Sequence, residues 1–64
     1  MNNPPTAHEI EALVEGLQFS ISALCREVGV DPSTFWRWKA GTNAPSVETV
    51  RKMVKAIQKR QRAA

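Results

Sequence analysis

Residues 20–41 read SISALCREVGVDPSTFWRWKAG, and this stretch predicts two short helices joined by a tight turn. Gly29 stands at the turn, where the backbone has to take a positive φ that a residue without a Cβ adopts at little cost. Asp31 is a good N-cap for the second helix, and Pro32 suits its first position, where an N–H would have no partner. The pattern predicts that this helix ends just before Gly41.

The helix before the turn is expected to begin at Ser20 or Ile21 and to end at Val28, with Ser20 as its cap. Cys25 lies where two helices have to approach each other closely, so a small side chain suits packing there. The alternative for this thiol is a redox or intermolecular role. A lone cysteine cannot form an internal disulfide and matches no zinc-ligand spacing, which favours the reducing cytoplasm.

A first helix is expected to follow a loose leader over residues 1–5. The Thr6 hydroxyl can cap it, and Glu9, three residues later, completes a capping box. His8 lies in its first turn on the polar side, where an ordinary surface role is expected. Apolar residues then recur on one stripe at helical spacing, namely Ile10, Leu13, Val14 and Leu17.

The last helix is expected to start after Pro45, with Ser46 as its cap, and to reach Gln58 or Lys59, leaving residues 61–64 as a frayed tail. Its inner arc carries Val47, Val50, Met53, Val54 and Ile57. Its outer arc is basic and carries Arg51, Lys52, Lys55, Lys59 and Arg62.

The chain has 64 residues, which is near the lower limit for a domain that folds without disulfides or metals. We expect one domain over residues 6–60 with a small core, to whose stability dimerisation could add. Neither a signal peptide nor an apolar run long enough to span a membrane is present in the sequence. The expected core residues are Leu13, Leu17, Leu24, Cys25, Val28, Val30, Phe35, Trp38, Val50 and Val54.

Charge is strongly segregated along the chain. The net charge is +3, but residues 1–31 sum to −4 and residues 32–64 to +7. Such polarity favours a polyanionic partner that approaches one side of the molecule. A merely solvated basic tail would account for residues 59–62, but not for Arg37 or Lys39.

The two faces of the helix over residues 32–40 differ in kind. At about 100° per residue, Phe35 and Trp38 share one face, and we expect Trp38 in the core. The opposite face carries Ser33, Trp36, Arg37 and Ala40. Trp36 should therefore be exposed, which is unusual for so large an apolar side chain and indicates a surface that becomes covered.

Residues from Phe19 to Ile57 resemble the helix-turn-helix domains of the Cro/CI, or XRE-like, family. Gln18 is a departure, because the family usually has Gly or Asn just before the hydrophobic residue, so the link between the first two helices is expected to differ in shape. The resemblance lies in Leu24-Cys25 through Val28-Gly29-Val30, in Ser33-Thr34-Phe35 and Arg37-Trp38 before Gly41, and in Pro45-Ser46.

This resemblance implies a compact all-α, four-helix domain of the lambda-repressor-like DNA-binding type, with the helix over residues 32–40 in the major groove. It places Pro32, Ser33, Trp36 and Arg37 at base edges, and Ser20, Ile21 and Thr34 close to the phosphates. Hydroxyls, amides, cations and helix N-termini also suit phosphate contacts. On that chemistry the further candidates are Lys39, Thr42, Asn43, Ser46, Arg51 and Lys52, whereas Lys55 and Lys59 are either contributors or merely solubilising.

Arg37 is the best candidate for reading sequence, because its planar fork can donate two hydrogen bonds to one guanine. A phosphate contact and an ion pair with Glu27 are the alternatives. Trp36 has one donor and no acceptor, so it would pack against thymine methyl groups or a sugar edge. A protein interface or partial burial within the domain are the alternatives for Trp36.

These expectations favour a small transcriptional repressor of phage, plasmid or bacterial origin that occupies a near-palindromic operator as a homodimer. Monomers that pair only on DNA are equally possible. The candidates for the dimer surface are Ala44, Met53, Ala56 and Ile57. No metal, cofactor or small-molecule substrate is expected, and the absence of a nucleophile–base set or phosphate-cradling glycine loop argues against an enzyme. The alternatives are an antitoxin that regulates its own toxin pair, and a protein-interaction or architectural module that docks through Trp36.

Overall fold

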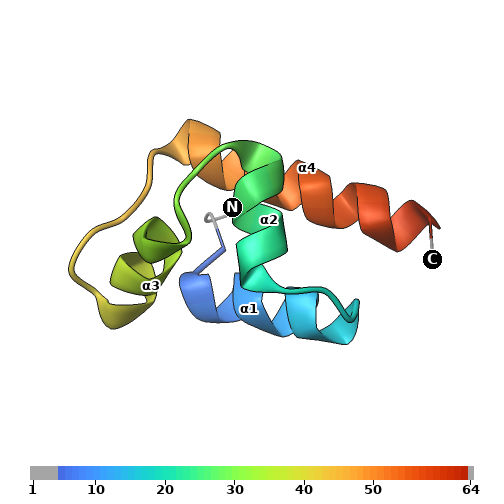
Figure 1. Cartoon of the computed structure of the whole chain (residues 1–64), viewed down its shortest axis with the longest axis horizontal. Helices are drawn as coiled ribbons and strands as arrows, with labels where there is room; N and C mark the ends of the chain where they lie inside the picture. The colour runs from blue at the N-terminus through green and yellow to red at the C-terminus, as the bar shows by residue number, and fades with distance from the viewer. Residues whose placement is uncertain (1–4, 64) are drawn as a thin grey trace.

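The computed structural model describes residues 5–63, and within that range the chain forms four helices and no strand (Figure 1). The leader predicted over residues 1–5 lies outside the described residues except for Pro5, as does Ala64. The described part measures 33 × 29 × 18 Å, so the predicted compact, all-α, four-helix domain is confirmed. The helices are α1 (Ala7–Gly16), α2 (Ile21–Val28), α3 (Pro32–Ala40) and α4 (Val47–Ala63).

Local hydrogen bonds explain where the first three helices begin. Thr6 Oγ1 accepts from the Glu9 amide at 3.2 Å, and Glu9 Oε1 accepts from the Thr6 amide at 2.8 Å, which completes the predicted capping box. Ser20 Oγ accepts an amide of the first turn of α2 at 3.0 Å. The Asp31 carboxylate accepts the Ser33 amide at 2.8 Å. Each cap satisfies an amide that would otherwise lack a partner, so the predicted helix starts are confirmed.

Each link between consecutive helices contains a residue with left-handed backbone. Gly29, with φ of 81°, ends α2, and Gly41, with φ of 84°, ends α3, both as predicted. Gln18 also has a positive φ, 61°, in the link between α1 and α2. That is the region which Gly and Asn adopt most readily. Gln18 therefore adopts a backbone conformation that is uncommon for a residue with a side chain.

All four helices contribute to one core. α2 packs against α3 and α4, and α1 packs against all three. Of the predicted core residues, Leu24, Cys25, Phe35 and Val50 are buried. The seven largest fully buried side chains are Ile10, Val14, Leu24, Cys25, Phe35, Met53 and Ile57. A half-buried shell packs around this core and includes Leu17, Phe19, Val28, Val30, Trp38 and Val54.

Two sets of sequence predictions about burial are wrong. Leu13, predicted in the core, is 41% exposed, because α1 buries the arc of Ala7, Ile10 and Val14 and Leu13 lies at its edge. Val47, assigned to the inner arc of the last helix, is 57% exposed. Three of the four candidates for the dimer surface are buried in the core, namely Met53, Ala56 and Ile57. For Met53 and Ile57 this burial confirms their predicted place on the inner arc of the last helix.

Helix α4 is longer than predicted, since it continues to Ala63 instead of ending at Gln58 or Lys59. Its last residues are good helix formers, and cations in a final turn interact favourably with the helix dipole. Arg60 also holds this end against the domain. Its guanidinium donates to Glu27 at 3.1 Å and lies 4.0 Å from the ring centroid of Phe19.

Candidate nucleic-acid interface

Helix α3 has one face in the core and one in solvent. Phe35 is completely buried, and its ring makes edge-to-face contacts with Trp36 at 5.3 Å and Trp38 at 5.8 Å between centroids. Trp36 is 45% exposed, and Ser33 and Arg37 are also exposed. The predicted opposition of the two faces is confirmed for these side chains. Trp38 is half-buried and packs against the core.

Trp36 borders a hollow that is formed by three helices. Phe19 and Ser20 at the start of α2 line this hollow together with the acidic side chains Glu11 and Glu15 of α1. Sequence reasoning missed these two carboxylates as neighbours of the candidate site. They lie more than twenty positions before Trp36 in the chain, and the packing of α1 against α3 brings them there.

Lys39, predicted to contact phosphate, is engaged within the domain. Its Nζ lies 2.8 Å from Glu11 Oε1 and 5.5 Å from the centroid of the Trp36 ring. Both partners of the pair keep part of their side chains in water. Such pairs contribute about 0–1 kcal/mol, so a phosphate could compete with Glu11 for this cation.

Arg37 is free to approach a partner from solvent. Its side chain is exposed and makes no ion pair within residues 5–63. The alternative pair with Glu27 does not form, because the Glu27 carboxylate accepts from Arg60. The Arg37 carbonyl accepts from the amide and hydroxyl of Thr42, each at 3.0 Å, which ties the loop after α3 to its last turn.

The residues predicted to contact phosphate are not equally available. Ile21 is buried, so the phosphate contact predicted at this position does not run through its side chain. The Ser46 hydroxyl accepts the Thr49 amide at 3.2 Å and caps α4. The other polar candidates are exposed or half-buried at the surface, namely Ser20, Thr34, Thr42, Asn43, Arg51 and Lys52, and so is Pro32 at the start of α3.

Two ion pairs form within the described chain, Lys39–Glu11 and Arg60–Glu27. Seven other cations make none there, and all seven are exposed: Arg26, Arg37, Arg51, Lys52, Lys55, Lys59 and Arg62. Six of the seven lie on α3 and α4. The predicted segregation of charge along the sequence is therefore also a segregation between helices.

Two side chains next to the turn have shifted ionisation. The Asp31 carboxylate has a pKa below its ordinary value of 3.8. The main cause is the hydrogen bond from the Ser33 amide, and the second is a hydrogen bond from the Ser33 side chain. The pKa of the Cys25 thiol is raised, mainly by burial and secondly by the negative charge of Asp31. A buried neutral thiol is a small apolar packing group, which fits the packing role expected for Cys25.

Over residues 5–63 there is no cluster of three or more metal-ligating side chains. None of the described helices combines the length and the apolar character needed to cross a bilayer. No family model, curated protein or solved structure matches this chain. The resemblance of residues 19–57 to Cro/CI domains thus stays a prediction from sequence.

Proposed function

We propose that this protein is a sequence-specific double-stranded DNA-binding transcriptional repressor of the lambda-repressor-like, Cro/CI type, with α3 in the major groove. One observation carries the proposal. A nine-residue helix keeps Ser33, Trp36 and Arg37 in solvent while Phe35 on its other side is completely buried. The major groove, about 12 Å wide, admits one helix, and an outward arginine can reach base edges there.

Each outward side chain of α3 has a role that fits its chemistry. Arg37 donates two hydrogen bonds to the O6 and N7 of a guanine. Trp36 packs against a thymine methyl group or a sugar edge. Ser33 and Pro32, in the first turn, approach the neighbouring bases.

The phosphate contacts come from the two sides of α3. Ser20 and Thr34 approach one strand, and Lys39 joins them once Glu11 releases it. Thr42 and Asn43 of the loop, the amides that follow Ser46, and Arg51 approach the other strand. These groups set the position of α3 and not its preference among bases.

Dimerisation on a near-palindromic operator would extend the site that is read, with half-sites about 34 Å apart. The buried candidates on α4 cannot form the dimer contact, so the loop before α4 is the segment that we propose for it. Ala44 is exposed there, and Val47 borders a largely apolar hollow that is also lined by Trp38 and Pro45.

A second candidate function is docking of a partner protein, such as the toxin of a toxin pair, through Trp36. The carboxylates of Glu11 and Glu15 beside this aromatic ring favour it, because a cationic side chain of a partner could bind there. The double substitution Glu11→Gln and Glu15→Gln separates the two functions. It should strengthen DNA binding by removing repulsion of phosphates, whereas it should weaken the binding of a cationic protein segment.

The experiment that tests the DNA-binding proposal is selection of bound duplexes from a random pool, followed by titration of the enriched duplex. Arg37→Ala should weaken binding to the enriched duplex by about 5- to 150-fold, since a bidentate contact contributes about 1–3 kcal/mol. Its affinity for random DNA should change much less.

Arg26→Ala is the matched control, because Arg26 is an exposed, unpaired arginine on α2 within the described chain. It should leave the preference for the enriched duplex unchanged. If Arg37→Ala lowers the affinity for the enriched duplex and for random DNA by the same factor, Arg37 contacts phosphate and does not read a base. Failure to enrich any duplex would contradict the proposal as a whole.

A further inference from the structure

The outward face of α4 carries a stripe of four unpaired cations. Lys52, Lys55, Lys59 and Arg62 recur at intervals of three and four residues, so they lie within an arc of about 80° on the helix. All four are exposed, and none forms an ion pair within residues 5–63. We call these four residues the α4 stripe.

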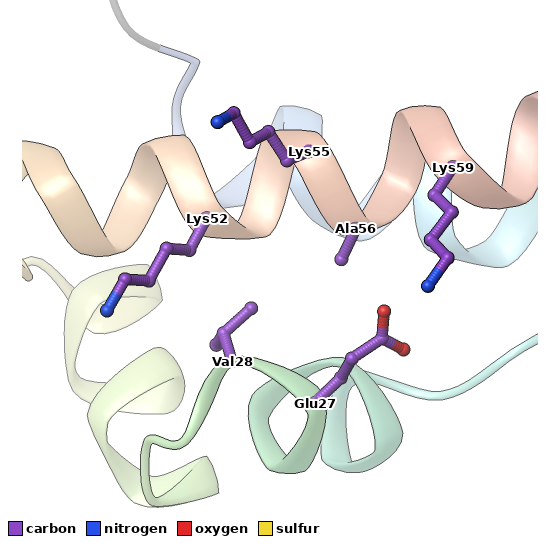
Figure 2. Close-up of a pocket in the computed structure, with 6 residues that line it drawn as sticks. All are labelled: Glu27, Val28, Lys52, Lys55, Ala56 and Lys59. Carbon is purple, nitrogen blue, oxygen red and sulfur yellow. The ribbon is translucent and has the colours of Figure 1, made fainter.

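Part of the α4 stripe forms one wall of a groove. Lys52, Lys55 and Lys59 line the groove together with the end of α2, where Glu27 and Val28 form the other wall. Figure 2 shows Lys52 and Lys59 extending toward the α2 side, whereas Lys55 points away from it. Figure 2 shows Lys59 pointing toward the Glu27 carboxylate, but that carboxylate already accepts from Arg60 at 3.1 Å. The three lysines that line the groove thus carry more positive charge than the single Glu27 carboxylate carries negative charge.

The α4 stripe and the outward face of α3 are separate surfaces. The hollow at Trp36 lies at the start of α2, whereas the groove lies at the end of α2, and no residue lines both. Figure 1 shows α3 and the C-terminal half of α4 at opposite ends of the long axis. Helices α3 and α4 each pack against α1 and α2, and their backbones do not approach each other.

The spacing of the stripe matches a phosphate backbone. Ten residues of helix from Lys52 to Arg62 rise about 15 Å. One strand of B-DNA carries one phosphate per about 3.4 Å of axis, which is about four phosphates over that length. Because the strand winds around the axis while the stripe is straight, long and flexible lysine side chains have to reach to either side to meet these phosphates, and such contacts need no particular base sequence.

We propose that the α4 stripe binds the phosphate backbone of a second DNA duplex, so that one molecule bridges two duplexes. The proposal rests on the proposed function for the first duplex, which α3 holds. A duplex is stiff over about 150 base pairs, so a short one seated on α3 does not fold round to the other end of the molecule.

The test uses an immobilised duplex of the selected sequence and a labelled duplex of unrelated sequence. The unsubstituted protein should retain the labelled duplex on the immobilised one. The triple variant Lys55→Gln, Lys59→Gln, Arg62→Gln should lower this retention at least tenfold at low salt, while binding to the selected duplex alone changes less than threefold. Its circular dichroism should match that of the unsubstituted protein, since all three side chains are exposed.

Salt dependence and single substitutions sharpen the test. Each phosphate contact contributes about 0.9 to the slope of log affinity against log salt, so the slope for the second duplex should fall by about 2.7 in the triple variant. Lys59→Gln should weaken bridging more than Arg26→Gln, which removes the same charge outside the stripe. The paired variant Lys55→Arg, Lys59→Arg keeps the charge and should keep bridging.

The outcomes are distinct. Undiminished bridging by the triple variant would overturn the proposal, because the second duplex would then be held by α3 of another subunit. The proposal would also be overturned if the unsubstituted protein bridges no duplexes and the triple variant loses affinity for the selected duplex. The stripe would then be part of the first interface. If α3 reads no sequence, the proposed function fails separately: the stripe still binds duplex DNA, and the triple variant loses that binding.

Discussion

Asp31 is a single residue whose charge supports the start of α3. Its carboxylate accepts the Ser33 amide, and this bond lowers its pKa from 3.8. A group with a lowered folded pKa stabilises the fold above its unfolded pKa, and the contribution is lost as pH falls through the lower folded value. We therefore expect part of the acid sensitivity of the domain, below about pH 4, to come from Asp31.

The substitution Asp31→Asn tests this at the same scale, because asparagine remains a good N-cap but does not titrate. Thermal unfolding followed by circular dichroism from about pH 5 to about pH 2.5 should show a shallower loss of Tm in the variant. Glu15→Gln is the control, since the exposed Glu15 carboxylate makes no hydrogen bond within the described chain. Identical pH profiles for Asp31→Asn and the unsubstituted protein would remove Asp31 from the explanation.

At the scale of elements, the turn between α2 and α3 decides where the outward face of α3 points. Gly29 has a φ of 81°, and a Cβ added there would meet nothing within 4 Å. The cost of Gly29→Ala is thus conformational, about 1–2 kcal/mol. Gly16, the last residue of α1, also has open space around it and no positive φ, so Gly16→Ala should stabilise by about 0.4–1 kcal/mol through the lower entropy of the unfolded chain. Urea unfolding of both variants should give effects of opposite sign, and effects of the same sign would contradict the left-handed turn.

At the scale of the whole molecule, a core built by four short helices leaves little stability in reserve. Met53 is completely buried, so Met53→Ala should cost about 2–5 kcal/mol and unfold a large fraction of the protein. Leu13, at 41% exposed, should lose less than about 1 kcal/mol on Leu13→Ala. Urea titration combined with sedimentation checks both. If the Met53→Ala variant is stable and has an altered oligomeric state, Met53 contributes to a dimer contact and not to the stability of the core.

Much of the local structure could be predicted because its causes are local. The Thr6, Ser20 and Asp31 caps bond amides two or three residues away, and Gly29 and Gly41 end helices by their own backbone freedom. The same holds for the two faces of α3, since helical geometry alone separates Phe35 from Trp36 and Arg37. What those outward side chains bind does not follow from such geometry, and the DNA-reading roles stay predictions.

The sequence by itself determined the helix starts, the turns and the face that α3 presents, because each depends on residues within one or two turns of the chain. The tertiary structure decided that Leu13 and Val47 are exposed and that α4 runs to Ala63. It also paired Lys39 with Glu11 and Arg60 with Glu27, which lie 28 and 33 positions apart. Burial and such ion pairs depend on which helices pack against each other. The periodicity of a single helix predicts its apolar face but not which helices will cover it.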